Sequence, residues 1–519
     1  MTRTLLTAET GGAPASPASA GPPPVRTIAL GTAGSLLMLA GSLGAAAVLV
    51  PDPVLGTGPL SWLRFGHGRM LAGLMVYAGF GLLLWAWVRL GRHVLAGRVG
   101  TRPVLAAAAC WTAPLLVAPA LFSRDVYSYL AQGAITLRGL DPYAVGPAVL
   151  DSPELVSGVH PFWMGTPAPY GPLFILLAKG VVWITGTNVL AGVILMRLVL
   201  TLGIVPLLWA LPRLVRHLGG NLPVAAWLAI AGPVTVVHLI GGPHNDVLMI
   251  GLLAAGTALV LERRHLLGIA LLTLAVAIKA TAVVALPFLV WIWTGHLDAT
   301  RWRGFARAAA GSLVTVGAVF AVVTVLARVD LGWISMLSAS SRIVNWLSLS
   351  TAVGELLHAL TAIVADVSRY DFVAVTRLLG MAALAAILVR QWWLARDGGP
   401  DAVRRAAIAL LAVAVLSPST LPWYLTWSLV LAAGLAWRRG HLAIMVAVAA
   451  FLVVPYSPDG ETLLYVWPFM AVAIALSVLA GVSLVRPDPL GLGGRQRPVG
   501  PTTVPDSGAS GTSGVSTSG

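Results

Sequence analysis

The sequence has 519 residues, of which 58% are hydrophobic and only 10% are charged, and its formal net charge is +14. This composition is far more apolar than that of soluble domains, and uninterrupted apolar runs of roughly 17 to 25 residues recur along it. Only helices and closed barrels span bilayers, and barrel strands alternate apolar with polar residues, so the sequence predicts an all-α polytopic membrane protein. The arginines lie in short loops between apolar runs, where they set orientation, so no nucleic-acid partner is expected. Because Cys110 is the single cysteine, disulfides within the chain and a cysteine zinc cluster are excluded.

In chain order, the sequence divides into an arm, an apolar body and a tail. Residues 1–26 and 486–519 are rich in Pro, Gly, Ser and Thr, and such segments bury too little apolar surface to offset chain entropy. We predict that both are disordered and cytoplasmic, and that residues 27–485 form one transmembrane domain. No small-residue cleavage site closely follows the first apolar run, so that run is expected to remain as an uncleaved first span.

Basic turns between the apolar runs are expected to face the cytoplasm. They lie at residues 89–102, 213–217, 263–265, 301–307, 396–405 and 438–439. The intervening segments then face outward: two large loops at about 123–170 and 328–372, expected to carry short amphipathic helices, and shorter ones at 241–246, around 279, 417–423 and 456–461. This scheme gives about 14 transmembrane helices. Residues 171–211 are apolar enough for two spans, but the flanking charges require one net crossing, so part should be re-entrant or steeply tilted.

The first outward loop opens with the polar stretch SRDVYSY, from Ser123 to Tyr129, directly after an apolar run. A carboxylate at this depth can meet a lipid-linked substrate and take the proton of an attacking sugar hydroxyl. Arg124, Tyr127 and Tyr129 could hold Asp125 ionised and oriented. Asp125 would equally suit an ordinary helix cap paired with Arg124, so the residues alone leave both roles open.

A second polar group, His244, Asn245 and Asp246, follows Gly242 and Pro243 in a short outward turn. It can bind a pyrophosphate-like head group, ligate a divalent cation or supply a second proton-transfer group. The alternative is a Pro-initiated turn in which Asn245 and Asp246 satisfy free N–H groups of the next helix.

Lys279 is one of two lysines and interrupts an apolar run. It can contact a lipid phosphate, or it can snorkel to the interface. Lys179 presents the same choice, and snorkelling fits it better because it lies farther from the other outward residues.

Aromatic residues accompany these polar groups on the outward side and can either stack on sugar rings or anchor the chain at the membrane interface. In the first loop they are Phe162, Trp163 and Tyr170, next to His160; later ones include Trp346, with Arg342 and Asn345, and Trp423 with Tyr424.

In this order, the segments SRDVYSY, the DPY turn at Asp141, PAPYGPLF, GGPHND, AIKAT and SPSTLPWYLTW resemble the actinobacterial polyprenol-phosphomannose-dependent α-1,6-mannopyranosyltransferases of the glycosyltransferase C superfamily. The resemblance extends from about Leu30 to Val485 and rests on the combination, since each segment is short. It implies a multi-helix plasma-membrane enzyme that transfers mannose from a polyprenyl monophosphate, with inversion, to a lipid-anchored α-1,6-mannan on the outer face.

The resemblance also implies roles for single residues. Asp125 matches the acidic catalytic residue of the superfamily and would be the general base. The expected donor-phosphate contacts are Arg124, His244, Lys279 and Arg342. The expected substrate contacts are Tyr127, Tyr129, His160, Trp163, Tyr170, Asn245, Asp246 and Trp423. Some relatives use a divalent cation such as Mg or Mn, and Asp246 with His244 would hold it here if one is used, so the need for a cofactor stays open.

Two other classes of function remain compatible with the residues. A flippase or transporter of lipid-linked sugars would also be basic, polytopic and rich in Gly and Pro, and fold resemblance alone does not fix chemistry. Transporters place their ionisable residues near the bilayer midplane, whereas the polar groups here gather on one side, which favours an enzyme. A related enzyme with another sugar, or a non-catalytic partner of a cell-wall polymerase, is a further alternative.

Overall fold

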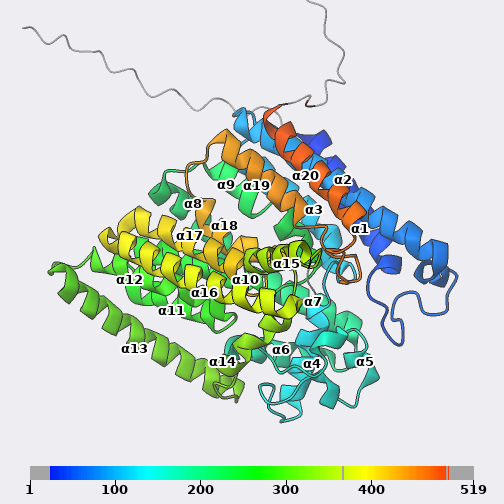
Figure 1. Cartoon of the computed structure of the whole chain (residues 1–519), viewed down its shortest axis with the longest axis horizontal. Helices are drawn as coiled ribbons and strands as arrows, with labels where there is room; N and C mark the ends of the chain where they lie inside the picture. Colours follow the sequence, from blue (N-terminus) through cyan, green and yellow to red (C-terminus); the bar gives the residue numbers. More distant parts are fainter. Residues whose placement is uncertain (1–23, 365–367, 487–488, 490–519) are drawn as a thin grey trace, which may run out of the picture.

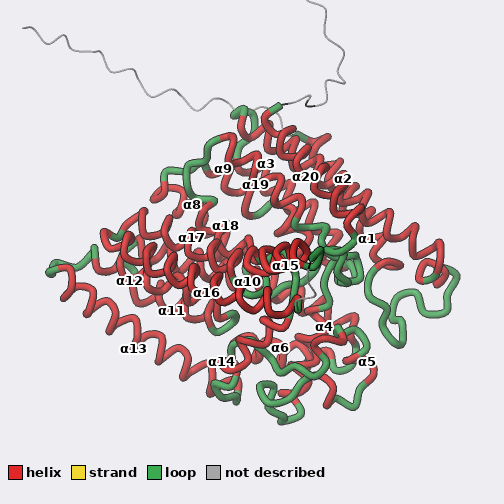
Figure 2. The backbone as a smooth tube through the Cα atoms, viewed as in Figure 1, coloured by secondary structure: helices red, strands yellow, loops and turns green. Residues whose placement is uncertain are grey.

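The computed structural model describes residues 24–364, 368–486 and 489. The arm and tail predicted to be disordered therefore lie almost entirely outside the described residues. Within them every regular element is helical, as the sequence predicts (Figure 2).

The helices before residue 300 are α1 Val25–Ala45, α2 Gly66–Leu95, α3 Thr101–Thr112, α4 Asp125–Leu137, α5 Pro153–Val156, α6 Pro172–Thr185, α7 Val189–Thr201, α8 Ile204–Leu218, α9 Leu222–Ala229, α10 Asp246–Leu261, α11 His265–Val276 and α12 Leu286–Thr294. Those after it are α13 Arg301–Ala327, α14 Trp333–Met336, α15 Leu349–Thr361, α16 Arg369–Leu394, α17 Gly399–Leu416, α18 Leu425–Ala432, α19 Arg439–Phe451 and α20 Trp467–Val485. The two large loops that are expected to face outward contain short helices, among them α5, α14 and α15.

Six helices in the described residues are long and apolar enough to cross a membrane: α1, α2, the run Val189–Leu218 formed by α7 and α8, α13, α16 with its 3₁₀ extension, and α20. A seventh candidate is α9 with the π-helix Val234–Gly241, a pair bent by 43°. The other apolar helices are shorter than a bilayer core requires of a straight span. The protein thus has the helices of a multi-pass membrane protein, whereas the total of about 14 spans and the glycosyltransferase C assignment stay predictions.

The ambiguous region 171–211 contains two kinds of helix. Its first part is α6, which has 14 residues and packs against α4. Its second part belongs to the 30-residue run Val189–Leu218. Only the second part is long enough for a full span, as a single net crossing would require.

Basic turns that are distant in sequence meet in space. Arg216 in the last turn of α8 contacts Glu262 after α10 at 2.9 Å, and Arg301 at the start of α13 contacts Asp397 after α16 at 3.1 Å. The end of α2, the start of α19 and the end of α20 also lie together, beside the described chain ends at the top of Figure 1.

The turns assigned to the outer side meet at the opposite helix ends. Arg124 contacts Glu461 at 3.1 Å, and Trp346 Nε1 donates to the carbonyl of Leu464 at 2.7 Å. The structure therefore gathers the two sets of turns at opposite ends of the helices.

Candidate active site

Asp125 is the first residue of α4, but it does not cap the helix. Its backbone N–H donates to Ser123 Oγ at 3.1 Å, so Ser123 supports the helix start. Arg124 turns away, because its Nε donates to the carbonyl of Asp459 at 2.8 Å and its guanidinium contacts Glu461 at 3.1 Å. The alternative in which Asp125 is a cap paired with Arg124 is therefore wrong. The carboxylate keeps 21% of its side-chain surface exposed.

Two side chains approach the Asp125 carboxylate. Tyr129, one turn later on α4, donates from its hydroxyl to Oδ2 at 3.5 Å, and His244 Nε2 lies 3.6 Å from the same oxygen. Burial raises the pKa of Asp125 to about 6, and the positive charge of Lys279 opposes part of that rise. A carboxyl group with this pKa can both accept and return a proton near neutral pH.

The His244 imidazole is fixed in orientation and tautomer. Its side chain is fully buried, and Nδ1 lies 2.7 Å from the carbonyl oxygen of His238. Since a carbonyl only accepts, Nδ1 carries a proton and Nε2 presents its lone pair toward Asp125 when the ring is neutral. The Trp423 ring lies against the imidazole, with centroids 3.6 Å apart. Asp125 and His244 are thus placed to share one proton.

Asp246 and Lys279 form a buried ion pair. Lys279 Nζ donates to both carboxylate oxygens, at 2.7 and 2.9 Å, and Trp427 Nε1 donates to Oδ1 at 2.5 Å. Asp246 is fully buried and the Lys279 side chain is 15% exposed. The Asp246 carboxylate therefore pairs with Lys279 and does not cap α10. Lys279 forms this buried ion pair instead of snorkelling to the membrane interface.

Asn245 is the N-cap residue of α10, yet its side chain makes no capping hydrogen bond. The side chain is fully buried, and neither amide atom has a hydrogen-bond partner in the described part of the chain. The alternative in which Asn245 satisfies the free N–H groups of α10 is therefore wrong. An unpartnered buried amide next to Asp246 leaves donor and acceptor capacity at the site.

Arg197 on α7 holds the turn that carries His244 and Asp246. Its guanidinium is fully buried and donates to the carbonyls of Ile240, Gly241 and Leu116 at 2.9, 3.1 and 2.9 Å. Arg197 was not predicted from the sequence, although a single Arg inside the apolar run ILMRLVL was the signal that could have indicated it.

The far end of the first outward loop closes beside Lys279. Gly171 donates its N–H to Ile278 O at 3.4 Å, and a Cβ on Gly171 would lie 2.5 Å from Ala277 O. The Tyr170 ring meets Tyr129 edge to face at 5.3 Å, so Tyr170 reaches the same site from the end of the loop. The backbone contact between Gly171 and the residues before Lys279 thus places Tyr170 beside Lys279. Because Tyr170 also packs on Tyr129, the same contact places α4 next to Lys279.

Other expected site residues lie outside this cluster. Tyr127 is buried, and its ring packs directly against Gly158: a Cβ on Gly158 would lie only 2.6 Å from Tyr127 Cγ. His160 Nε2 contacts Glu461 at 3.6 Å. Arg342 donates to Thr166 Oγ1 at 3.2 Å.

The residues His160, Trp163, Arg342, Arg124 and Glu461 form what we call the rim. Trp163 packs edge to face on Phe162, and the Arg342 guanidinium lies 6.0 Å from the same ring. Substrate contacts by the rim and by Tyr127 stay predictions.

Trp427 was not predicted from the sequence, whereas Tyr424 was expected either to stack on a sugar ring or to anchor the chain at the interface. The two rings stack at 3.9 Å, and Lys279 Nζ lies 5.2 Å from the Tyr424 ring centre. Their spacing of three residues in PWYLTW, which places both rings on one helix face, was the available signal.

A divalent cation does not fit the donor set that the sequence suggested. Both oxygens of Asp246 are engaged by Lys279, and His244 Nε2 faces Asp125. Among the described residues no group of three or more His, Cys, Asp or Glu side chains is arranged to hold a metal ion.

Comparison with known proteins gives a consistent result. The family model described as alpha-(1->6)-mannopyranosyltransferase, N-terminal domain, matches residues 28–295, and the model described as MptB C-terminal domain matches residues 350–486. No solved structure matches the chain significantly.

Curated relatives match over nearly the whole chain. Alpha-(1->6)-mannopyranosyltransferase A of Mycobacterium tuberculosis is 44% identical over 468 residues, which cover 89% of this chain and 90% of the relative. The protein of the same name from Corynebacterium glutamicum is 33% identical, with 86% and 96% covered. Alpha-(1->6)-mannopyranosyltransferase B of that organism is 30% identical, with 82% and 76% covered.

Proposed function

This chain belongs to the alpha-(1->6)-mannopyranosyltransferase family, and we propose that it is a membrane enzyme that forms α-1,6-mannosidic linkages with mannose from polyprenyl-phosphate-mannose. The acceptor is a lipid-anchored mannoside of the lipomannan and lipoarabinomannan type. The observation that carries the proposal is the cluster in which the Asp125–His244 pair stands beside the Asp246–Lys279 pair.

Asp125 acts as the general base. The 6-hydroxyl of the acceptor attacks the anomeric carbon of the donor from the side opposite the phosphate. The new O6–C1 bond forms while the bond between C1 and the phosphate oxygen breaks, which inverts the configuration at C1 and releases polyprenyl phosphate. The hydroxyl proton passes to Asp125, whose raised pKa suits this role.

His244 supports Asp125 rather than the donor phosphate. It is fully buried, and its lone pair faces Oδ2 of Asp125. Once Asp125 has taken the proton, its O–H can donate to Nε2 of the neutral imidazole, which stabilises the protonated form of the base. The expectation that His244 contacts the phosphate is therefore replaced by a role in positioning the base.

Lys279 is the cation best placed for the departing phosphate. An ammonium group has three N–H donors, of which two reach Asp246, and the side chain keeps 15% of its surface exposed. The third donor can bind a phosphate oxygen and stabilise the charge that develops on it. Arg124 and Arg342 on the rim add positive charge at the outer boundary of the site.

The site lies at the helix ends opposite to the basic turns, which assigns it to the outer face of the plasma membrane if the basic turns are cytoplasmic. The polyprenyl chain then rests among apolar helices and needs no specific fit. A transporter would have to carry the lipid past these groups, whereas the paired acid and base groups at one end favour transfer chemistry.

The variant Asp125→Asn tests the proposal. It keeps the shape of the side chain but cannot accept a proton, so transfer to an α-1,6-mannoside acceptor should fall by about 10²- to 10⁴-fold while binding of polyprenyl-phosphate-mannose persists. The matched control is Asp151→Asn, because Asp151 is exposed in the same loop. Purified protein in detergent, assayed for transfer and for donor binding, gives both readouts. Full transfer by Asp125→Asn would overturn the assignment of the base, and donor binding without any transfer by the wild type would contradict the proposed enzyme activity.

A further inference from the structure

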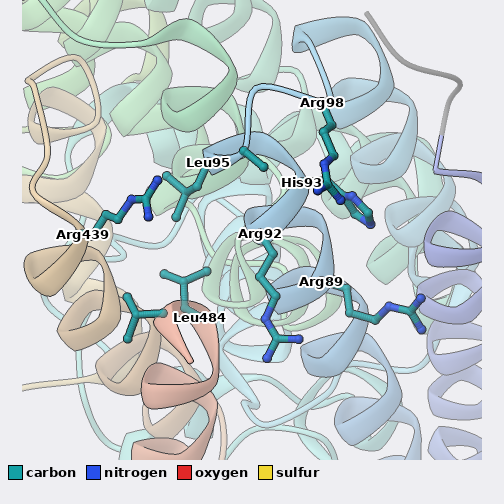
Figure 3. Close-up of a pocket in the computed structure, with 9 residues that line it drawn as sticks. Arg89, Arg92, His93, Leu95, Arg98, Arg439 and Leu484 are labelled. Carbon is teal, nitrogen blue, oxygen red and sulfur yellow. The ribbon is translucent and has the colours of Figure 1, made fainter. Parts of the chain in front are cut away.

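A basic cavity lies at the end of the molecule remote from Asp125. The end of α2, the turn after it, the start of α19 and the end of α20 enclose about 380 Å³. The residues that line it include Arg89, Arg92, Arg98, Arg439, Leu484 and Val485. Figure 3 shows Arg92 and Arg439 extending on either side of Leu95 and Leu484. The lining thus includes four arginines beside apolar side chains, and Arg92 Nε donates to the carbonyl of Ser483 at 2.6 Å.

The charge of this cavity is not balanced by acidic groups. None of its lining residues is acidic, and none of its arginines forms an ion pair within the described part of the chain. Other basic turns on the same face are partly neutralised, since Arg216 contacts Glu262 and Arg301 contacts Asp397. Arginines placed only to set orientation would need no shared cavity, so this concentration of unpaired positive charge calls for an anion.

The position of the cavity identifies the source of that anion. Both α2 and α20 are candidate membrane spans, and both end at the cavity. The cavity therefore lies at the depth where a helix leaves the hydrocarbon and where lipid head groups are found. A soluble phosphate would gain nothing from Leu484 and Val485, whereas a phospholipid places its glycerol and first acyl carbons beside them.

We infer that this cavity binds the phosphate of an anionic phospholipid from the membrane leaflet at the basic end of the protein. The arginines contact the phosphate oxygens, and the acyl chains run along the apolar surfaces of α2 and α20. A lipid bound in the cavity contacts the ends of α2, α19 and α20 at once. Because it binds only the folded protein, it raises the stability of that state by mass action. The inference rests on the membrane location of the helices and does not depend on the proposed transfer reaction.

The test uses full-length protein in a neutral detergent and the double variant R98Q/R439Q. Both arginines are exposed at the cavity edge, so their replacement should leave the fold intact. The matched control is R303Q/R307Q, which removes two exposed arginines from the start of α13 on the same face. The probes are phosphatidylglycerol, phosphatidylcholine and inorganic phosphate, and the readouts are native mass spectrometry and the Tm as lipid concentration rises.

We expect phosphatidylglycerol, but not phosphatidylcholine, to bind and raise the Tm of the wild type and of R303Q/R307Q. In R98Q/R439Q its affinity should fall by roughly tenfold or more, since each arginine near an anionic head group contributes severalfold. Equal weakening in both double variants would overturn the inference, because it would show a general surface charge. Displacement of phosphatidylglycerol by millimolar inorganic phosphate would overturn it too, because the site would then be one for a soluble anion. The Asp125→Asn protein should bind the lipid like the wild type, which separates this result from failure of the proposed function.

Discussion

Lys279 and Asp246 are separated by 33 residues in the sequence, yet they form a buried pair at 2.7 Å. Removing one partner leaves a charge without compensation, and the fully buried Asp246 would suffer most. We expect Asp246→Asn and Lys279→Met each to lower the free energy of unfolding by about 3 to 5 kcal/mol. The double variant should lose less than the sum of the two single variants, because it removes both charges.

Denaturation in detergent, followed by tryptophan fluorescence, measures this double-mutant cycle. The cycle needs only the wild type and the three variants. Additive losses would contradict the pairing, because independent residues show no coupling energy.

The pH dependence of transfer follows from Asp125. A general base works in its ionised form, and burial raises the pKa of this carboxyl from 3.8 to about 6. Below pH 6 Asp125 is increasingly protonated, so kcat/KM should fall about tenfold per pH unit, and above roughly pH 7 it should level off. The same titration on His244→Gln should give a plateau about 10²-fold lower with unchanged donor affinity, because the imidazole assists the base without contacting the donor.

A rate profile from pH 4.5 to 8.5, with donor binding measured at each pH, checks this. A rate profile that is flat through pH 6 would show that Asp125 is not the general base. A weaker affinity of His244→Gln for the donor would indicate that His244 contacts the donor phosphate and would contradict its role in supporting Asp125.

At the residue scale, the sequence predicted Asp125, His244, Asp246 and Lys279 because polar groups beside apolar runs are conspicuous. It could not tell which of them pair, since pairing depends on how helices that are distant in sequence pack. Trp427 was missed for the same reason: it contacts Asp246 across 181 residues. Single residues were therefore predictable, whereas the partner of each residue was not.

At the element scale, the site depends on the contact between the start of α6 and the chain before Lys279. A Cβ on Gly171 would meet Ala277 O at 2.5 Å, and backbone oxygen cannot yield as a flexible side chain could. We expect Gly171→Ala to shift Tyr170 and α4 from Lys279 and to lower kcat/KM by about 10- to 100-fold. Overpacking should also cost about 1 to 3 kcal/mol of stability.

The matched control is Gly180→Ala, because Gly180 lies in α6, for which Gly171 is the N-cap residue, and a Cβ at Gly180 has no atom within 4 Å. The measurements are kcat/KM and Tm of Gly171→Ala and Gly180→Ala in detergent. If Gly171→Ala is as active as Gly180→Ala, the close contact is not needed to assemble the site.

The helices themselves followed from the apolar runs, but their division did not. The sequence could not show whether residues 171–211 cross the membrane once or twice. Where no charged residue marks a helix end, hydropathy does not show where one helix ends and the next begins. The structure separates the 14-residue α6 from the run Val189–Leu218 at a turn through Gly186, where φ is 56°. The presence of a glycine at this position, between two apolar runs, was the available sign of the break in the sequence.

At the scale of the whole molecule, the positive charges and the site occupy opposite ends of the helices. Positive charge near short loops sets membrane orientation, because arginines resist translocation. The same arrangement that keeps the basic ends inside would therefore expose Asp125 and Lys279 to the outer leaflet. The basic cavity and the candidate active site would then face different leaflets.

Labelling of single cysteines tests this arrangement in intact cells. Cys110 is first replaced by Ala, which leaves a chain without cysteine. Glu461 on the rim is exposed, and so is Arg438 at the basic end, so Glu461→Cys and Arg438→Cys compare the two ends. A membrane-impermeant maleimide should label Glu461→Cys in intact cells and label Arg438→Cys only after the membrane is permeabilised. Because the two positions belong to opposite ends, labelling of both from outside would contradict a membrane between them. The reverse pattern would place Asp125 in the cytoplasm and exclude a donor presented at the outer leaflet.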